Sequence, residues 1–297
     1  MRKWVLGLSL TLGCRSVEVG LDSAVATTSV PTVAVDLDNC DQAIDPYLPL
    51  FYSSFFACVH ASWDDDDVVL WTDGLPPHAS AYYPHDHPNH VAFDDRGGTH
   101  VQNPGEIVTQ SFEIRIPTNP VAKGIVIDDA AVDNVMNTNG DEYGGGGQGV
   151  ALDGVEIFAA MAAPGDVLAD EANTFDAYEG HPAGATYHYH FNTPGPLEVL
   201  ADRSLTTSTT PGSADVELYG VMCDGTLVFG CTELDGSPPD DSDFDAQNGH
   251  LHDIDDRMNT YFFGRYHTHV CPSLWPDYVF FPEVAYYETS GCPAGGP

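Results

Sequence analysis

Histidine is the residue type in this sequence best placed to do chemistry, because two pairs of histidines with one residue between the partners occur in matching sequence contexts. One pair is His188 and His190, and the other is His267 and His269. Side chains two positions apart on a β-strand point to the same face of the strand. If both segments are strands, each pair offers two imidazole nitrogens to one metal ion.

The two pairs belong to an internal repeat of three blocks that occur twice in the same order. The first block is Gly149-Val150-x-x-Asp153-Gly154-x-x-Ile157-Phe158 and again Gly220-Val221-x-x-Asp224-Gly225-x-x-Val228-Phe229. The second is Phe175-Asp176-Ala177-x-x-Gly180-His181 and again Phe244-Asp245-Ala246-x-x-Gly249-His250. The third is Tyr187-His188-Tyr189-His190 and again Tyr266-His267-Thr268-His269. We therefore predict a duplicated unit with halves of about 149–191 and 220–270, each made of a hairpin, a loop ending in Gly-His and a His-x-His strand.

The predicted site joins the two halves around one transition-metal ion. Its ligands are three histidines from each half: His181, His188, His190, His250, His267 and His269. Candidates to orient these imidazoles through hydrogen bonds are Asp176, Asp245 and His78. Imidazole-rich sites suit zinc or copper better than calcium or magnesium. The sequence therefore predicts one zinc or copper site shared by the two halves.

Other interpretations of the same residues stay open. The histidines can instead brace the core of a structural or interaction domain as a hydrogen-bonded network. A metal-dependent hydrolase is a third alternative, but the sequence holds no Gly-x-Ser-x-Gly element for a serine nucleophile, and enzymatic activity is undecided. A loop with His85, His87 and His90 is either a metal-catching segment or a polar loop. Oxygen-rich loops at 137–142 and 240–245 can take calcium, although neither has EF-hand spacing.

The charge of the chain excludes two classes of partner. The 45 Asp and Glu residues outnumber the 9 Lys and Arg residues, and the formal net charge is -36. Nucleic acids and anionic lipid surfaces need clustered cations on the protein. The predicted partner is therefore a metal ion, and the sequence points to no particular protein partner.

The first fourteen residues resemble an export signal. Arg2 and Lys3 precede a short apolar stretch, and Leu10-Thr11-Leu12-Gly13-Cys14 is similar to a bacterial lipoprotein cleavage box. About ten apolar residues are too few for a permanent membrane span. We expect a secreted protein, or a lipoprotein of the outer membrane or cell surface that contacts the membrane only through a lipid on Cys14. A flexible tether would follow over residues 15–38.

The cysteines other than Cys14 predict three disulfides, because an even number in an exported chain favours pairing. They are Cys40, Cys58, Cys223, Cys231, Cys271 and Cys292. Their spacing leaves the connectivity open. The shortest closures would be Cys40 with Cys58, Cys223 with Cys231, and Cys271 with Cys292.

The elements that would position the histidines are mainly strands. From residue 39 to residue 297, short apolar runs alternate with clusters of Gly, Pro, Asn and Asp. This pattern predicts a mainly β, single sandwich- or barrel-like domain that contains the internal duplication and little helix. A helix is predicted only for residues 164–172, where proline stands at the start and acidic residues follow.

The chain resembles the YHYH domain family. The eponymous motif is Tyr187-His188-Tyr189-His190, and the segments 73–78, 110–120, 176–181, 218–225 and 245–250 also resemble the family, so that the likeness extends from about Trp63 to about Pro282. Thr268 stands where the second motif often has Tyr, and Gln247 stands where Cys is common, which puts one family disulfide in doubt. The resemblance implies an exported domain of a kind often found in bacteria, and it implies no particular activity.

Overall fold

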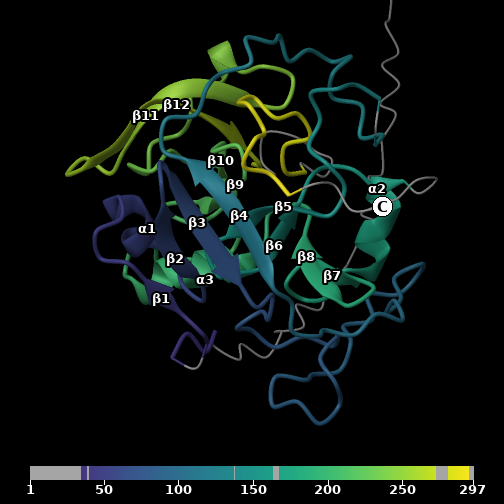
Figure 1. The fold of residues 1–297 in the computed structure, drawn as a ribbon. Helices are drawn as coiled ribbons and strands as arrows, with labels where there is room; N and C mark the ends of the chain where they lie inside the picture. Colours follow the sequence, from purple (N-terminus) through teal and green to yellow (C-terminus); the bar gives the residue numbers. More distant parts are fainter. Residues whose placement is uncertain (1–34, 39, 137, 163–166, 272–279, 294–297) are drawn as a thin grey trace, which may run out of the picture. The chain divides into compact units, whose positions relative to one another are not determined.

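The computed structural model describes residues 35–38, 40–136, 138–162, 167–271 and 280–293, in two β-sheets (Figure 1). The smaller sheet has the order β1-β2-β3-β4, with β1 (Ala43–Ile44), β2 (His60–Asp64), β3 (Asp67–Thr72) and β4 (Phe112–Pro117). The described helices are short: α1 (Leu50–Phe55), α2 (Leu168–Glu171), α3 (Pro194–Asp202) and the 3₁₀ turns η1 (Ala172–Thr174) and η2 (Asp241–Asp243). The predicted mainly β, sandwich-like fold with little helix is confirmed.

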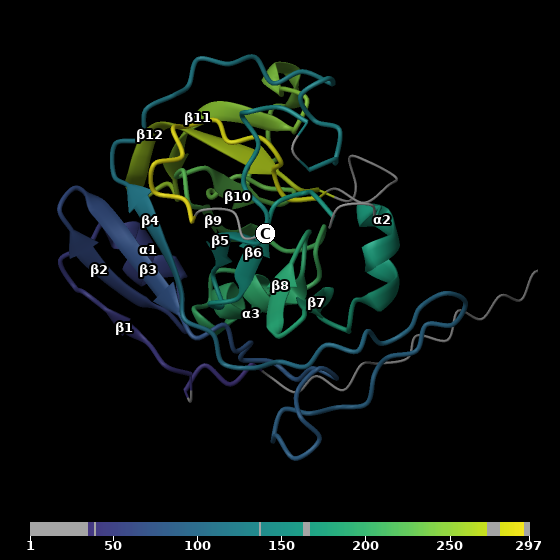
Figure 2. The same cartoon turned by 45° about the vertical axis from the view of Figure 1, so that its right-hand side comes forward.

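The larger sheet carries the duplication. Its order is β11-β12-β10-β9-β5-β6-β8-β7, with β5 (Gly147–Ala151), β6 (Glu156–Phe158), β7 (Gly180–Ala183), β8 (Thr186–Tyr189), β9 (Leu218–Met222), β10 (Leu227–Phe229), β11 (Gly249–Asp255) and β12 (Thr260–His269). The halves meet at the antiparallel pair β5 and β9, where Val150 lies opposite Val221. Outward from this pair, β6, β8 and β7 follow in one half as β10, β12 and β11 follow in the other. The two His-x-His hairpins therefore lie at opposite ends of the sheet (Figure 2).

One hydrophobic core joins the two sheets. Val68 and Ile114 from the smaller sheet belong to the same buried cluster as Val150, Ile157 and Val221 from the larger sheet. Burial of each such side chain contributes about 1.5–3 kcal/mol. The smaller sheet therefore supports the central strands from which both histidine hairpins extend.

All three predicted disulfides are present in the structure. They join Cys40 to Cys58, Cys223 to Cys292 and Cys231 to Cys271. Of the three shortest closures, Cys40–Cys58 forms, whereas the other four cysteines pair across longer separations. The Cys231–Cys271 bond follows from the pairing of β10 with β12, because each cysteine lies two residues after the paired residues Phe229 and His269. The Cys223–Cys292 bond joins the residue after β9 to the C-terminal segment.

The helices differ in part from the expectation. The helix predicted for 164–172 is seen as α2 and the following turn η1, while residues 163–166 lie outside the described part. The longest described helix, α3, was not predicted. It begins with Pro194 after Thr193, whose hydroxyl caps the helix by accepting a hydrogen bond from the backbone N–H of Gly195.

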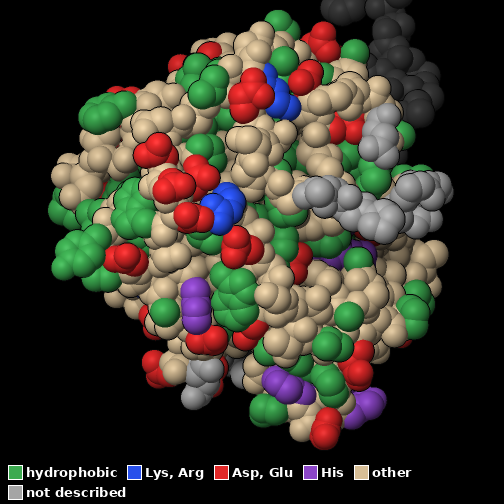
Figure 3. Space-filling view, viewed as in Figure 1, with side chains coloured by type: hydrophobic (Ala, Val, Ile, Leu, Met, Phe, Trp, Pro, Cys, Tyr) green, Lys and Arg blue, Asp and Glu red, His purple; other side chains and the backbone are tan. Residues whose placement is uncertain are grey.

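Residues 1–34, which include the predicted export signal, Cys14 and most of the predicted tether, lie outside the described residues. Within the described part, no helix combines the length and apolar character that a membrane crossing requires. Acidic side chains are spread over the face shown in Figure 3, with few basic ones among them.

The one difference between the two histidine motifs leaves a buried hydroxyl without a partner. Tyr189 donates its hydroxyl hydrogen bond to Asp153 at 2.9 Å. Thr268 takes the place of Tyr189 in the second half, and its buried hydroxyl has no hydrogen-bond partner among the residues that the structure describes. The aspartate equivalent to Asp153 is Asp224, which accepts instead from the hydroxyl of Tyr143 at 2.8 Å.

We expect Thr268→Val to raise the free energy of unfolding by about 1 kcal/mol, because a buried polar group without a partner costs about 1–3 kcal/mol. Equilibrium urea unfolding followed by circular dichroism measures the change. The matched control is Thr193→Val, which removes a hydroxyl that caps α3 and donates to the carbonyl of Tyr178. This control should lower the free energy of unfolding by about 1 kcal/mol. A loss of stability in Thr268→Val would contradict the prediction.

Candidate metal centres

The six predicted histidine ligands are gathered into two clusters, one in each half of the larger sheet, and each cluster includes a glutamate. The first centre consists of Glu171, His181, His188 and His190, and the second consists of Glu233, His250, His267 and His269. In each centre, one potential ligand atom per residue lies within 4.8 Å of all the others. The expectation of one site shared by both halves is therefore wrong, because the hairpins that carry the histidines lie at opposite ends of the sheet.

Strand pairing explains how each half assembles its three imidazoles. His181 lies directly opposite His188 in the antiparallel pair of β7 and β8. His250 lies opposite His267 in the same way in β11 and β12. The remaining histidine of each centre is two residues beyond, on the same face of the strand. The Gly-His and His-x-His motifs therefore form one three-histidine face in each half.

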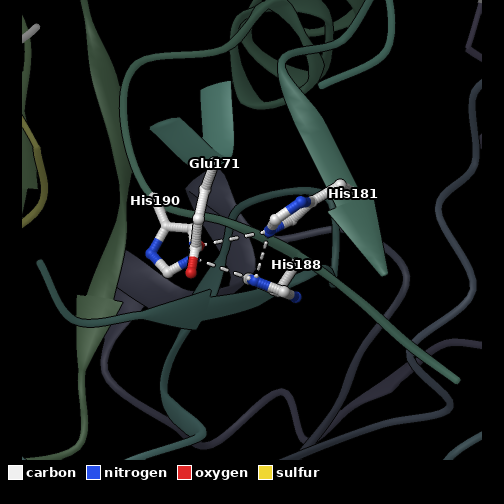
Figure 4. Close-up of side chains that lie close together, drawn as sticks. All are labelled: Glu171, His181, His188 and His190. Atoms are coloured by element: carbon white, nitrogen blue, oxygen red, sulfur yellow. Dashed lines mark hydrogen bonds and ion pairs between the residues drawn. The ribbon is translucent and has the colours of Figure 1, made fainter. Parts of the chain in front are cut away.

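In the first centre the four side chains point toward one another (Figure 4). The Nε2 atom of His188 lies 3.1 Å from Nε2 of His181 and 3.0 Å from Nε2 of His190. The Oε2 atom of Glu171 lies 3.0 Å from Nε2 of His190 and 3.6 Å from Nε2 of His181. The ring of Phe158 stacks on His188 at 3.7 Å and closes one side of the site.

The second centre has the same plan. Nε2 of His250 lies 2.9 Å from Nε2 of His267 and 3.3 Å from Nε2 of His269. The carboxylate of Glu233 reaches all three rings: Oε1 lies 3.2 Å from Nε2 of His250 and 3.4 Å from Nε2 of His269, and Oε2 lies 3.2 Å from Nε2 of His267. His267 and His269 are fully buried.

The distances in the second centre distinguish between two coordination geometries. With bonds of about 2.0 Å, ligand atoms around a tetrahedral ion are all about 3.3 Å apart, whereas each ligand of a square-planar ion lies about 4.0 Å from the one opposite. Nε2 of His250 lies between 2.9 and 3.3 Å from one atom of each of the three other residues. His250 therefore has no ligand atom opposite it at about 4.0 Å, which excludes a square-planar arrangement and is compatible with a tetrahedral one.

In the first centre, all three imidazoles carry their proton on Nδ1. His188 donates from Nδ1 to the carbonyl of Thr186 at 3.0 Å, and His190 donates from Nδ1 to the carbonyl of Ala159 at 3.2 Å. Nδ1 of His181 lies 2.6 Å from the hydroxyl of Thr174, which itself donates to the carbonyl of Glu171 and therefore accepts from the ring. All three Nε2 lone pairs consequently face the centre of the cluster.

The second centre shows the same tautomers. His267 donates from Nδ1 to the carbonyl of Arg265 at 3.1 Å, and His269 donates to the carbonyl of Gly230 at 2.8 Å. His250 donates from Nδ1 to the carboxylate of Asp243 at 3.0 Å. Hydrogen bonds from the second ring nitrogen are the usual means by which proteins orient metal-ligating histidines.

The surroundings of His181 and His188 in the first centre disfavour their protonated forms. Burial lowers the pKa of His181 to about 3, and burial with the neighbouring imidazoles lowers the pKa of His188 well below its ordinary value. In the second centre burial lowers the pKa of His267, whereas for His250 the contacts with Glu233 and Asp243 outweigh burial and raise the pKa. Burial alone would raise the pKa of Glu233, but its contacts with the three imidazoles hold it below the ordinary value.

The two glutamates were not predicted from the sequence. Glu171 ends α2, four residues before the second block of the first repeat, whereas Glu233 follows β10, four residues after the first block of the second repeat. Because the two positions are not equivalent, comparison of the repeats cannot find them. Only the position of each glutamate in space, next to the three histidines of its centre, identifies it.

The predicted orienting aspartates act on the tyrosines of the motif. Asp176 accepts from the hydroxyl of Tyr187 at 2.9 Å, and Asp245 accepts from the hydroxyl of Tyr266 at 2.6 Å. Tyr187 and Tyr266 point to the face of the strand opposite the histidines. Asp176 and Asp245 therefore hold the hairpins on the face opposite the histidines. The Nδ1 atoms of the histidines donate to other groups.

His78 lies behind the first centre as well. Its Nε2 atom is 2.7 Å from the hydroxyl of Tyr189, its Nδ1 atom is 3.1 Å from the carbonyl of Ala79, and its ring stacks on Tyr178 at 3.7 Å. Burial lowers the pKa of His78 to about 3, so the ring is neutral. It supports the strand that carries His188 and His190.

The remaining loops considered from the sequence supply none of the clustered ligand atoms among the described residues. His85 and His90 lie in an exposed to half-buried loop with their rings 4.4 Å apart, and His87 stacks on Tyr83. In the loop 240–245, Asp243 contacts His250 and Asp240 caps η2. In the loop 138–142, Glu142 accepts from Thr138, while residue 137 lies outside the described part.

No protein-family model, curated protein or solved structure matches this chain.

Proposed function

We propose that this protein binds two zinc ions, one in each half, and that the ions hold the two histidine hairpins in place. The observation that carries the proposal is the convergence of three imidazole Nε2 atoms and one carboxylate in each centre, at separations of 2.9–3.6 Å. Three lone pairs and a negative charge repel one another at such distances unless a cation lies between them.

Zinc fits this set of ligands better than the alternatives. Calcium and magnesium prefer oxygen ligands, while three imidazoles and a carboxylate suit zinc or copper. The tetrahedral arrangement around His250 favours zinc, because copper(II) prefers a tetragonal geometry. Four protein ligands in a buried tetrahedron are also typical of zinc sites that stabilise a fold.

The alternative, a metal-free hydrogen-bonded network that stabilises the core, does not explain the direction of the histidine hydrogen bonds. In such a network, neighbouring imidazoles donate to one another or to carboxylates. Here the Nδ1 protons are directed outward to carbonyl and side-chain oxygens, which leaves Nε2 of His188 facing Nε2 of both His181 and His190. The tautomers are those of a set of metal ligands.

We propose that the protein is exported, as the sequence predicts. Three disulfides are compatible with an extracellular location. Attachment through a lipid on Cys14 and membership of the YHYH domain family are parts of the same proposal. Both rest on sequence features alone.

The first test is the metal content of the full chain, purified without a polyhistidine tag and without chelator. We expect two zinc ions per chain by inductively coupled plasma mass spectrometry. His188→Ala with His190→Ala should leave one ion, and so should His267→Ala with His269→Ala, because each pair supplies two of four ligands. The matched control is His85→Ala with His87→Ala, which changes two histidines outside both centres and should keep both ions.

Two results would defeat the proposal. One is wild-type protein that holds no transition metal even after dialysis against micromolar zinc. The other is loss of both ions in each double variant while circular dichroism shows intact folding. The second result would indicate a single shared site.

A further inference from the structure

We propose that the two centres have different roles: the second is a locked structural site, whereas the zinc of the first exchanges the carboxylate of Glu171 for a small anion from solution. The inference rests on the proposed function, since it requires an ion in each centre. Four differences between the halves support it.

The first difference is a disulfide next to the second centre. Cys231 follows Gly230, whose carbonyl accepts from His269, and Cys271 lies two residues after His269. The Cys231–Cys271 bond therefore ties the segment that carries Glu233 to the strand that carries His267 and His269. At the equivalent positions the first half has Ala160 and Asn192, which cannot form such a bond.

The second difference is the segment that supplies each carboxylate. Glu233 begins a tight turn, in which its N–H donates to the carbonyl of Ser237 at 2.8 Å and its carbonyl accepts from Gly236 at 3.0 Å. Glu171 is the last residue of α2, which has four residues and continues directly into the three-residue turn η1. Such short helices have little stability of their own, and segments of this kind open at low cost.

The third difference is exposure. The side chain of Glu171 is 18 % exposed and that of His181 is 8 % exposed. In the second centre, the side chain of Glu233 is 10 % exposed and that of His250 is 3 % exposed. Glu171 is the most exposed of these four side chains. An incoming molecule would therefore approach the first ion from the side of Glu171.

The fourth difference is how firmly each carboxylate is held by its partners. Glu233 contacts all three imidazoles of its centre through both of its oxygens. The closest contact of Glu171 with an imidazole is 3.0 Å, to His190, and its contact with His181 is longer at 3.6 Å. The carboxylate contacts of Glu171 are therefore made through one oxygen, whereas those of Glu233 use both of its oxygens.

Charge decides which class of ligand replaces Glu171. Zinc with three neutral imidazoles carries a charge of 2+, and the carboxylate lowers it to 1+. When the zinc–oxygen bond to Glu171 breaks, the electron pair stays on the carboxylate, and an anion restores the lost charge by forming a new bond to zinc. The reaction is a ligand substitution without electron transfer. Small anions such as azide, and hydroxide formed when a bound water passes its proton to the released carboxylate of Glu171, have the required size and charge.

The first experiment measures zinc release from the full chain to the chromophoric chelator 4-(2-pyridylazo)resorcinol. We expect two phases of equal amplitude, with rates that differ at least tenfold. The fast phase should be absent from His188→Ala with His190→Ala, and the slow phase should be absent from His267→Ala with His269→Ala. Cys231→Ser with Cys271→Ser should speed the slow phase at least threefold, while the control pair Cys40→Ser with Cys58→Ser should leave it unchanged.

The second experiment replaces zinc by cobalt(II) and adds azide. Azide should change the visible absorption of the wild-type protein and of His267→Ala with His269→Ala. It should not change the absorption of His188→Ala with His190→Ala, which keeps only the second centre. This readout does not depend on release rates, and the absorption of bound cobalt reports directly on each variant that folds.

The outcomes separate this inference from the proposed function. Two ions with equal release rates, a slow phase that belongs to the first centre, or an azide response from the second centre would each overturn the inference and leave two-zinc binding intact. Wild-type protein that binds no metal would overturn both.

Discussion

Removal of both metal ions is expected to lower the melting temperature of the protein by about 20 °C, about 10 °C for each ion. A ligand that binds only the folded state, present at a thousand times its dissociation constant, stabilises that state by about 4 kcal/mol. For a domain of this size, about 1 kcal/mol corresponds to roughly 2–4 °C. The metal-free state is further disfavoured because the Nε2 atoms of His188 and His190 then face each other at 3.0 Å without a cation.

Differential scanning calorimetry before and after treatment with EDTA measures this effect. Zinc added back should restore the melting temperature, and calcium at the same concentration should not, because calcium does not favour imidazole ligands. The variant His188→Ala with His190→Ala should show only part of the chelator effect, since it keeps the second centre. A melting temperature that stays within 1 °C after elemental analysis shows complete metal removal would refute a stabilising role for the ions.

The second large effect is expected from Gly249→Ala, in the Gly-His block of the second half. A Cβ atom at residue 249 would overlap the hydroxyl oxygen of Tyr266 and the adjoining ring carbon. Tyr266 is buried and its hydroxyl donates to Asp245, so the ring cannot move aside at low cost. Overpacking of a well-packed site costs about 1–3 kcal/mol, and here a buried hydrogen bond is lost as well.

We therefore expect Gly249→Ala to lower the free energy of unfolding by about 3 kcal/mol and to weaken zinc binding in the second centre, because Gly249 precedes His250. Urea unfolding and the zinc content of the folded protein measure the two effects. Gly140→Ala is the matched control, since a Cβ atom there meets no atom within 4 Å. Equal stabilities of the two alanine variants would show that the contact between Gly249 and Tyr266 is unimportant.

The same contact explains why the repeat pairs Gly-His with Tyr-His. In the first half, a Cβ atom at Gly180 would lie 2.5 Å from the hydroxyl oxygen of Tyr187. Each tyrosine thus packs over the glycine on the paired strand, and its hydroxyl reaches the aspartate of the same block. This packing sets the register in which His181 lies opposite His188. The Gly-His and Tyr-His motifs together therefore align the imidazoles on the face of the hairpin opposite the tyrosines.

Local patterns were enough to predict the six histidines of the two candidate centres, the β class and the presence of three disulfides. The reason is that alternation along a strand is local: His188 and His190 must share a face wherever the strand lies. The repeat added His181 and His250, because equivalent positions in two copies of one unit have equivalent surroundings.

Local patterns did not predict the features that depend on contacts between distant segments of the chain. The pairing of β5 with β9 at the middle of the sheet separates the two hairpins, so that two candidate metal centres replace the one expected site. The positions of Glu171 and Glu233, and the pairing of Cys231 with Cys271, likewise depend on segments that meet only after the sheet has formed. Residue spacing along a chain specifies which side chains share a face, whereas the order of strands in space specifies which faces meet.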